Sequence, residues 1–214
     1  MGRTIWVLAV ALGVTLSACR TVPPVPPSSA DVPTDATGTW RATATDADKE
    51  RVRGWYSGWQ AALADARAKG FGADIDREGL LLQPAAALPN PHLPAGDYRC
   101  RTIKIGAQGR SSLSYVAYGW FRCRGAPEQG LSSLTKISGS QRPVGLIFPD
   151  NLKRQIFLGT LELGDEKMAV NYGSDRMRDM AGLVERIGDN RWRLVLPAPA
   201  YESLLDVIEL VPAS

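Results

Sequence analysis

Short segments of alternating polar and apolar residues fill the chain from residue 97 to residue 211. The segments cover residues 97–105, 114–124, 134–138, 145–148, 154–162, 167–172, 180–187, 191–196 and 205–211. A period of two is typical of β-strands, and the glycine, aspartate and asparagine residues between segments favour turns. Because no helical segment separates these eight or nine strands, we predict a closed or nearly closed antiparallel β-barrel. A two-sheet β-sandwich is the alternative.

One helix is predicted ahead of the strands, over residues 46–69. Its apolar positions recur at spacings of three and four, and they are Val52, Trp55, Trp59, Leu63 and Ala66. Thr45 followed by Asp48 resembles a capping box, and Gly70 stands where a glycine commonly ends a helix. We therefore expect a helix that packs on the barrel, or plugs it, through this apolar face.

Several further positions are expected to be buried or closely packed. Gly54 and Gly58 lie inside the predicted helix, where each glycine costs about 1 kcal/mol relative to alanine. This cost indicates a close approach, and we expect the sheet to pack across both glycines. Near the C-terminus, Leu194 and Leu196 should lie in the core, with Trp192 partly buried.

The N-terminal residues 1–18 have the pattern of a bacterial signal peptide, with Arg3 followed by an apolar run over residues 5–16. That run is too short to span a bilayer. Residues 16–19, Leu-Ser-Ala-Cys, resemble the lipobox of bacterial lipoproteins. The resemblance implies cleavage before Cys19, acylation of Cys19, and an anchor in the membrane. A plain secretory signal with an incidental cysteine is the alternative.

The segment after the anchor, residues 19–45, is predicted to be a tether. Its prolines are Pro23, Pro24, Pro26, Pro27 and Pro33, and they stand among small and polar residues with little apolar content. Such a segment cannot bury enough surface to fold. Arg20 replaces the aspartate associated with inner-membrane retention, so the expected location is the outer membrane, facing the periplasm. A single β-rich domain should then occupy residues 46–212.

Two further cysteines, Cys100 and Cys123, each stand between arginines in predicted strands. An exported protein meets an oxidising compartment, so we predict a disulfide between them. A metal site built on these two thiolates would lack further ligands, since His92 is the only histidine of the chain.

The arginines beside the cysteines form the candidate binding site that the sequence suggests. If the two cysteines face each other on antiparallel strands, alternation places four guanidinium groups on the opposite face. The expected pairs are Arg99 with Arg124 and Arg101 with Arg122, followed by Ile103 with Trp120 and Ile105 with Tyr118. We predict an anion site there for a lipid phosphate or a peptidoglycan carboxylate. The alternative is a solvated face with neighbouring carboxylates.

The residue inventory excludes several enzyme classes. One histidine rules out three-histidine zinc sites, and no serine-nucleophile, dinucleotide or phosphate-loop motif is present. We predict no metal and no cofactor. A net charge of +3 is too small to indicate nucleic acid. Carboxylate pairs remain as an acid–base route, and the candidates are Glu162, Glu166, Asp175, Asp179, Glu185 and Glu209.

The expected function is that of a tethered module that binds an envelope lipid, peptidoglycan or an envelope protein. A carboxylate-dependent glycan hydrolase and a purely structural envelope protein are the alternatives. The interior of the barrel distinguishes them: a cavity favours binding, two close carboxylates favour hydrolysis, and a packed interior favours protein partners.

Several sequence runs also resemble those of one family of uncharacterised bacterial predicted lipoproteins. The runs are residues 96–101, 115–118, 121–123, 140–145, 157–160, 179–182, 192–197 and 206–210. The chain is similar from Trp40 onward to domain of unknown function family 4893. This resemblance implies no activity, substrate or catalytic residue.

Overall fold

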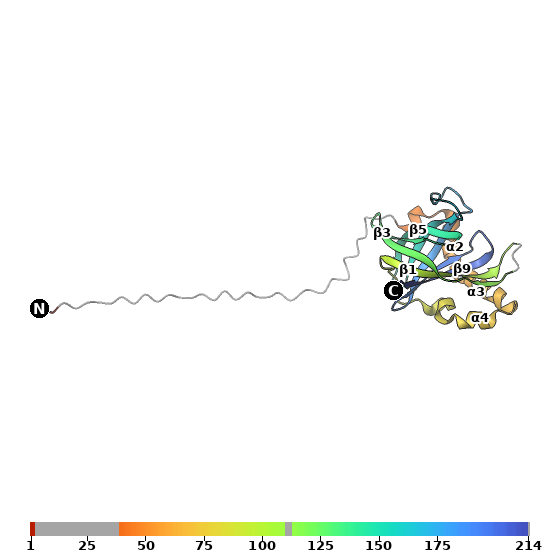
Figure 1. Cartoon of the computed structure of the whole chain (residues 1–214), viewed down its shortest axis with the longest axis horizontal. Coiled ribbons are helices and arrows are strands. Elements are labelled where there is room, and N and C mark those ends of the chain that lie inside the picture. Colours follow the sequence, from red (N-terminus) through yellow and green to blue (C-terminus); the bar gives the residue numbers. More distant parts are fainter. Residues whose placement is uncertain (3–38, 110–112, 214) are drawn as a thin grey trace. The chain divides into compact units, whose positions relative to one another are not determined.

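Nine strands form one antiparallel sheet, and eight of them close into a barrel (Figure 1). A computed structural model describes residues 1–2, 39–109 and 113–213, so the predicted signal peptide, lipobox and most of the tether lie outside the described residues. The strands are β1 (Gly96–Ala107), β2 (Tyr115–Ala117), β3 (Phe121–Glu128), β4 (Leu131–Lys136), β5 (Gln141–Asn151), β6 (Arg154–Leu163), β7 (Asp179–Gly188), β8 (Arg191–Pro197) and β9 (Ser203–Pro212). The order runs from β1 through β3 to β9, and β9 pairs with β1. The predicted barrel is confirmed.

The segment predicted as one strand over residues 114–124 is two strands. Residues 103–105 of β1 pair with β2, whereas residues 96–100 pair with β3, so both lie on the same side of β1. The prediction was wrong here because Tyr118 and Trp120 continue the alternation of residue types through the break. The two-residue period alone therefore could not locate the break between the two strands.

The segment predicted as a strand over residues 167–172 lies in the loop between β6 and β7. Its apolar side chains Met168 and Val170 are exposed, and none of the strands that the structure describes pairs with it. Tyr172 is held differently, since its hydroxyl donates to Asp48 and accepts from the backbone N–H of Thr45 at 3.1 Å. Tyr172 is therefore held by contacts with a helix that is distant in sequence, and not by pairing with another strand.

The predicted helix over residues 46–69 is interrupted at Gly54, which separates α2 (Asp46–Arg53) from α3 (Trp55–Ala68). Its ends agree with the prediction: the Asp48 N–H donates to the Thr45 hydroxyl, and Gly70 has a φ of +93°. The other short helices are α1 (Trp40–Thr43), α4 (Gly72–Arg77), η1 (Gly79–Leu82) and η2 (Pro84–Ala86). None of the helices in the described part of the chain is long and apolar enough to cross a membrane.

The close approach between helix and sheet lies away from the two helix glycines. A Cβ atom on Gly58 would meet nothing within 4 Å, so no strand packs across it. The tight contact is instead at Gly106 of β1, where a Cβ would lie 3.0 Å from the Cα of Ala62. The expectation was wrong because the small residue that permits close packing belongs to the strand.

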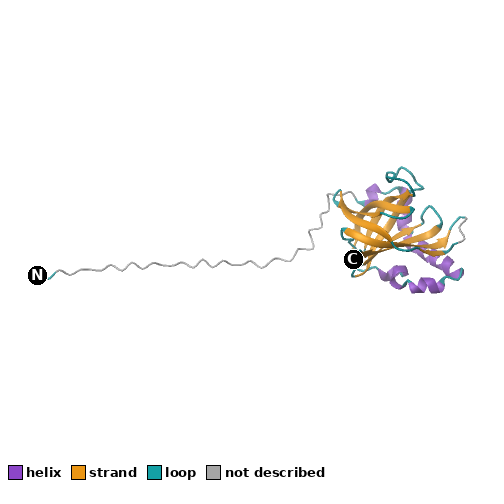
Figure 2. Cartoon of the chain, in the orientation of Figure 1, coloured by secondary structure: helices purple, strands orange, loops and turns teal. Residues whose placement is uncertain are grey.

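The helices cover the outside of the barrel, which gives the domain two apolar layers (Figure 2). In the outer layer, Val52 and Trp59 are buried, whereas Trp55 and Leu63 are partly buried. In the interior, Leu194, Leu196 and Trp192 are all buried, Trp192 more completely than expected. The helix face predicted from the sequence therefore packs on the barrel wall.

The folded region begins ahead of residue 46. Trp40 in α1 is 6% exposed, and its indole N–H donates to Asp150 at the end of β5, at 2.8 Å. The last residues of the predicted tether are thus part of the domain.

Candidate ligand-binding pocket

The predicted disulfide between Cys100 and Cys123 is present and lies inside the barrel. Because side chains alternate along a strand, Thr102 and Lys104 of β1 face the same interior as Cys100. At the level of these two residues the barrel contains a pocket of about 190 Å³, which we call the barrel pocket. Eight of the strands contribute lining residues, among them Lys136, Gln141, Leu161, Met180, Leu196, Asp206 and Ile208.

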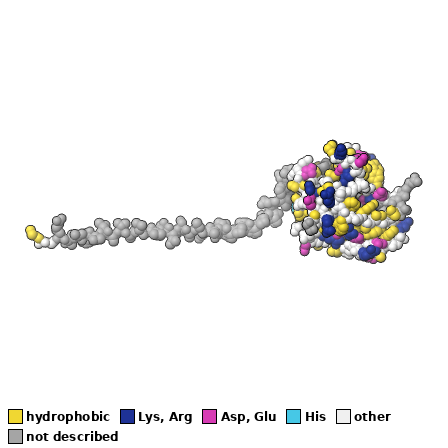
Figure 3. All heavy atoms as spheres, viewed as in Figure 1, with side chains coloured by type: hydrophobic (Ala, Val, Ile, Leu, Met, Phe, Trp, Pro, Cys, Tyr) yellow, Lys and Arg dark blue, Asp and Glu magenta, His cyan; other side chains and the backbone are white. Residues whose placement is uncertain are grey.

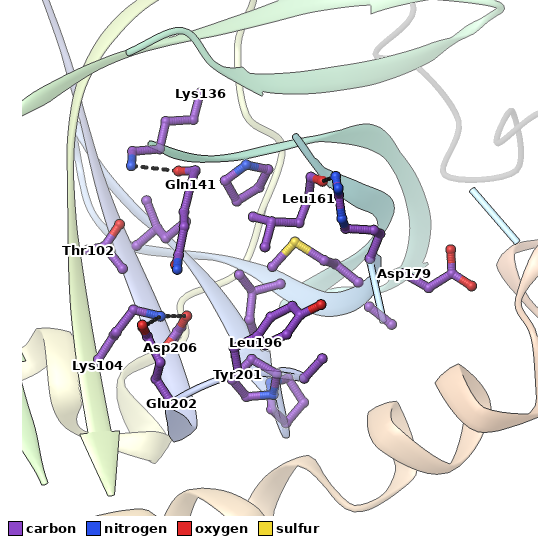
Figure 4. A pocket seen from close by; sticks show the side chains of 18 of the residues that line it. Thr102, Lys104, Lys136, Gln141, Leu161, Asp179, Leu196, Tyr201, Glu202 and Asp206 are labelled. Atoms are coloured by element: carbon purple, nitrogen blue, oxygen red, sulfur yellow. Dashed lines mark hydrogen bonds and ion pairs between the residues drawn. The ribbon is translucent and has the colours of Figure 1, made fainter. Parts of the chain in front are cut away.

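One side of the barrel pocket is polar (Figure 4). Lys104 and Asp206 are opposite each other on β1 and β9, and the Lys104 Nζ lies 3.0 Å from the Asp206 carboxylate. Glu202 at the rim lies 3.3 Å from the same ammonium. Burial lowers the pKa of Lys104, but these two carboxylates more than offset it, so the pKa lies above its usual value. Lys104 is therefore a paired, charged group.

Lys136, at the end of β4, has a different environment. Its side chain is buried at 5% exposure, and its Nζ donates to the backbone carbonyl of Gln141 at 2.8 Å. The ammonium also lies 4.0 Å from the centre of the Phe121 ring. Burial, together with the positive charges of Lys104 and Arg142, lowers the pKa of Lys136 to about 8.

Most of the buried charged side chains of the domain form ion pairs. Among the described residues, the buried charged side chains are Asp48, Lys104, Lys136, Asp179, Glu185, Arg193, Asp206 and Glu209. Six of these eight form ion pairs with charged partners. Lys136 and Asp179 form none with any residue that the structure describes, and both line the barrel pocket. Burial raises the pKa of Asp179. The Asp179 carboxylate accepts from the backbone N–H of Gly173 at 2.8 Å and points away from the other labelled side chains of the pocket (Figure 4). Lys136 is therefore the buried charge within the pocket that has no oppositely charged partner among the described residues.

The other side of the barrel pocket is apolar. Leu161 and Leu196 lie across the pocket from Lys136 and Gln141, and Tyr201 lies near its mouth (Figure 4). Met180 and Ile208 complete this wall. A pocket with one apolar wall and a few convergent polar groups is the usual form of a small-molecule site.

The β8–β9 loop forms part of the rim through Pro199, Ala200, Tyr201 and Glu202. Ala198 and Glu202 at its two ends have φ angles of +46° and +67°, a left-handed conformation that is costly for residues other than glycine. The Glu202 contact with Lys104 helps to offset this cost. The conformation of the rim therefore depends partly on the charges inside.

The predicted arginine register is wrong. Arg99 is opposite Arg122 rather than Arg124, because Tyr98, not Cys100, is opposite Cys123. A disulfide can join residues that are offset along neighbouring strands, so its presence did not fix the register. The hydrophobic pairs shift too: Ile103 is opposite Ala117, and Ile105 is opposite Tyr115.

The four arginines are not brought together as one anion site. Arg101 is bound by Glu78 and Glu209, and Arg124 lies 2.7 Å from Asp97. Only Arg99 and Arg122 remain without an ion pair among the described residues, and Arg99 lies over the Trp120 ring. On the face that Figure 3 shows, basic and acidic side chains are interspersed. This arrangement resembles the alternative of a solvated surface with neighbouring carboxylates.

The candidate catalytic carboxylates are mostly bound by arginine. The pairs are Glu162 with Arg142, Glu166 with Arg178, Glu185 with Arg154 and Arg193, and Glu209 with Arg101 and Arg191. Asp175 accepts from the backbone N–H of Met177, and only Asp179 of the six lines the barrel pocket. These carboxylates therefore do not form a pair around one substrate cavity.

The sequence reasoning did not select Lys104, Lys136 or Asp206. A signal for Lys104 was available, since alternation along residues 100–104 puts it on the face of Cys100. Nothing in the sequence indicated that Lys136 and Asp206 enter the same space, because β4 and β9 are distant in the chain.

Comparison with known proteins gives one match. A family model described as a domain of unknown function, DUF4893, matches residues 40–210. No curated protein and no solved structure matches the chain. The matched region contains every strand through most of β9, including the residues that form the polar side of the barrel pocket. The chain therefore belongs to the DUF4893 family.

Proposed function

We propose that this protein is a ligand-binding module of the cell envelope, anchored to a membrane through Cys19, and that its barrel pocket binds a small amphiphilic molecule. The observation that carries the proposal is the pocket itself, with an apolar wall facing buried lysines and an aspartate. A barrel built only for structural purposes gains nothing from buried charge, which is costly to remove from water.

The size of the pocket limits the ligand. Sites for drug-sized molecules have volumes of about 300–1,000 Å³, whereas the barrel pocket has about 190 Å³. The pocket therefore suits a small molecule, or one end of a longer amphiphile whose remainder extends past the β8–β9 rim.

The proposed location has two independent supports. The lipobox at residues 16–19 implies acylation of Cys19, and stable anchoring by acyl chains follows from about 0.8 kcal/mol per buried methylene. The Cys100–Cys123 disulfide fits an oxidising compartment outside the cytoplasm. We propose the outer membrane, with the domain in the periplasm, where lipids, peptidoglycan and envelope proteins are accessible.

The anchor is tested by replacing its cysteine. The Cys19→Ala variant should appear in the soluble periplasmic fraction or remain unprocessed, whereas the unaltered chain should fractionate with membranes. A Cys100→Ala, Cys123→Ala double variant with an intact Cys19 controls for effects of thiol loss. Unchanged membrane association of Cys19→Ala would contradict lipid anchoring.

Binding is tested by calorimetric titration of the full chain carrying Cys19→Ala. Octanoate, octanol and octylamine serve as probes of one chain length. We expect at least one to bind with a stoichiometry near one, and Ala200→Trp at the rim to abolish that binding. Ala85→Trp, at an exposed position outside the pocket, is the matched control. No binding by any probe, or equal binding by the Ala200→Trp variant, would refute a pocket function.

A further inference from the structure

We infer that the ligand of the barrel pocket carries an anionic group, a carboxylate or a phosphate ester, and that the Lys136 ammonium binds it. The inference rests on the proposed function and specifies the chemistry of its ligand. The apolar part of the ligand then lies against the wall that contains Leu161, Met180 and Leu196.

The first argument is the missing counter-charge. Burying an unpaired ammonium is costly, and folded proteins normally pair such groups. Here Arg193 is paired with Glu185, and Lys104 with Asp206, but Lys136 has no carboxylate partner among the described residues. Lys104 and Lys136 are both buried and both line the pocket, and of these two only Lys136 lacks a carboxylate partner. A bound anion would supply the partner that the chain itself does not provide.

The second argument is the unused hydrogen-bonding capacity of the Lys136 ammonium. An ammonium has three N–H donors. One is directed at the Gln141 carbonyl, and the Phe121 ring covers another side of the group. The donors that remain have no partner in the described part of the chain, and carboxylate and phosphate oxygens are strong acceptors for them.

The third argument concerns the neighbouring charges. Lys104 is neutralised by Asp206 and Glu202, so it competes little for an anion. The same pairing engages those two carboxylates and weakens their repulsion of an incoming anion. Arg142 is paired with Glu162, but its positive charge still contributes to the lowered pKa of Lys136. The electrostatic environment of Lys136 therefore favours a negative ligand group.

The test compares ligands that differ only in the head group. The full chain carrying Cys19→Ala is titrated at pH 7 with octanoate, octyl phosphate, octanol and octylamine. We expect one of the two anions to bind at least tenfold more tightly than octanol, and the better anion identifies carboxylate or phosphate. Acetate and inorganic phosphate, tested separately, show whether the apolar part of the ligand is needed.

Variants then assign the effect to Lys136. Lys136→Met, which retains the length of the side chain, should weaken anion binding at least tenfold and leave octanol binding unchanged. Lys153→Met is the matched control, because Lys153 is exposed and does not line the pocket. Equal affinity for octanoate and octanol, with no effect of Lys136→Met, would overturn the inference and leave the proposed function intact. Absence of binding by all probes would instead reject the function.

A measurement on the unaltered pocket guards against a variant that fails to fold. Anion affinity should fall as pH rises from 7 to 9, since the Lys136 ammonium of the free protein is lost through a pKa of about 8. The charged groups around it are Lys104, Arg142 and Asp206, and the pKa of Lys104 is raised, so Lys104 stays protonated over this range. Octanol affinity should not change. Anion affinity that is constant over this range would also contradict the inference.

Discussion

The two ends of the barrel interior differ although the same strands build both. At the end that we call closed, Tyr98 and Trp192 meet edge to face with ring centroids 6.1 Å apart, and Leu93 belongs to the same buried apolar cluster. At the open end, Lys104, Lys136 and Asp206 surround the barrel pocket. Along β1, the inward-facing residue after Tyr98 is Cys100 of the disulfide. The next inward-facing residue, Thr102, is the first polar one.

This difference separates stability from binding within one barrel. Apolar burial contributes about 25 cal/mol per Å² to folding, and the described residues that are buried together at the closed end carry no charge that would offset it. The open end places charges in the same interior, where each costs free energy unless it is paired. We interpret the closed end as the source of the stability that allows the open end to hold an unpaired lysine.

The largest expected effect concerns the closed end. The Cys100→Ala, Cys123→Ala double variant should lose about 3–5 kcal/mol of unfolding free energy, because the disulfide restricts the unfolded chain and its sulfurs fill the interior. Urea denaturation measures this loss. Octanoate affinity of the folded variant should stay within a factor of two. A loss below 1 kcal/mol would show that the two ends do not divide stability and binding in this way.

The second prediction concerns the open end, where we expect a substitution to raise the unfolding free energy. Lys136→Met should raise the unfolding free energy at pH 7, by at most about 3 kcal/mol, because it removes a buried charge without a partner. The same denaturation experiment measures it, with the exposed Lys153→Met as control. If Lys136→Met destabilises the domain at pH 7, Lys136 has a stabilising partner and the comparison between the two ends fails.

The third prediction follows from the lowered pKa of Lys136. Its pKa is about 8 in the folded protein and 10.5 at its ordinary value, so the unfolded chain binds more protons between these pH values. Unfolding free energy must then rise with pH across that window. We expect the stability deficit of the unaltered protein relative to Lys136→Met to narrow steadily from pH 8 to pH 10.5. A constant difference across this range would mean that Lys136 titrates normally.

The smallest effect is expected on the outer surface of the closed end. Arg99 and Arg122 are exposed and directly opposite, and like charges in such positions destabilise a sheet. Arg122→Gln should therefore raise the unfolding free energy by about 0.5 kcal/mol or less. Arg124→Gln, which breaks the contact with Asp97, should not raise it and is the control.

The same surface arginines test the anion site predicted from the sequence. Titration with vesicles that contain phosphatidylglycerol compares the Cys19→Ala chain with and without Arg99→Gln and Arg122→Gln, at two salt concentrations. Equal binding by both proteins would leave these arginines as a solvated surface. Weaker binding by the substituted chain, with unchanged octanoate affinity, would establish a second site independent of the barrel pocket.

Local signals predicted the elements that depend on neighbouring residues. The cap at Thr45, the helix end at Gly70 and most strands were predicted because each follows from residues close in sequence. The disulfide was predicted from the two cysteines and from the expected export of the chain. The strand predicted at residues 167–172 was wrong because alternation shows only that a strand could form. Pairing with another strand decides whether it does.

The candidate site was largely missed for a related reason. The arginines attracted attention because they stand beside the cysteines, yet Arg101 is bound by Glu78 and Glu209. Those partners belong to a helical segment and to β9, far from Arg101 in sequence. Whether a charged side chain has an oppositely charged partner depends on residues that are distant in sequence. The sequence therefore could not distinguish an arginine that forms structural ion pairs, such as Arg101, from an unpaired lysine in the pocket, such as Lys136.

By itself, the sequence determined the fold class, the two-residue period, the position of the helical region and the disulfide. The first three properties arise from backbone geometry and from apolar patterning, which act over a few residues, and the disulfide follows from the two cysteines of a chain that is expected to be exported. Only the tertiary structure decided which strand faces which, and therefore that Lys104, Lys136 and Asp206 enter one pocket. Closure of the barrel brings β4 and β9 to the same interior, and the electrostatic energy of a buried charge depends on what shares that interior.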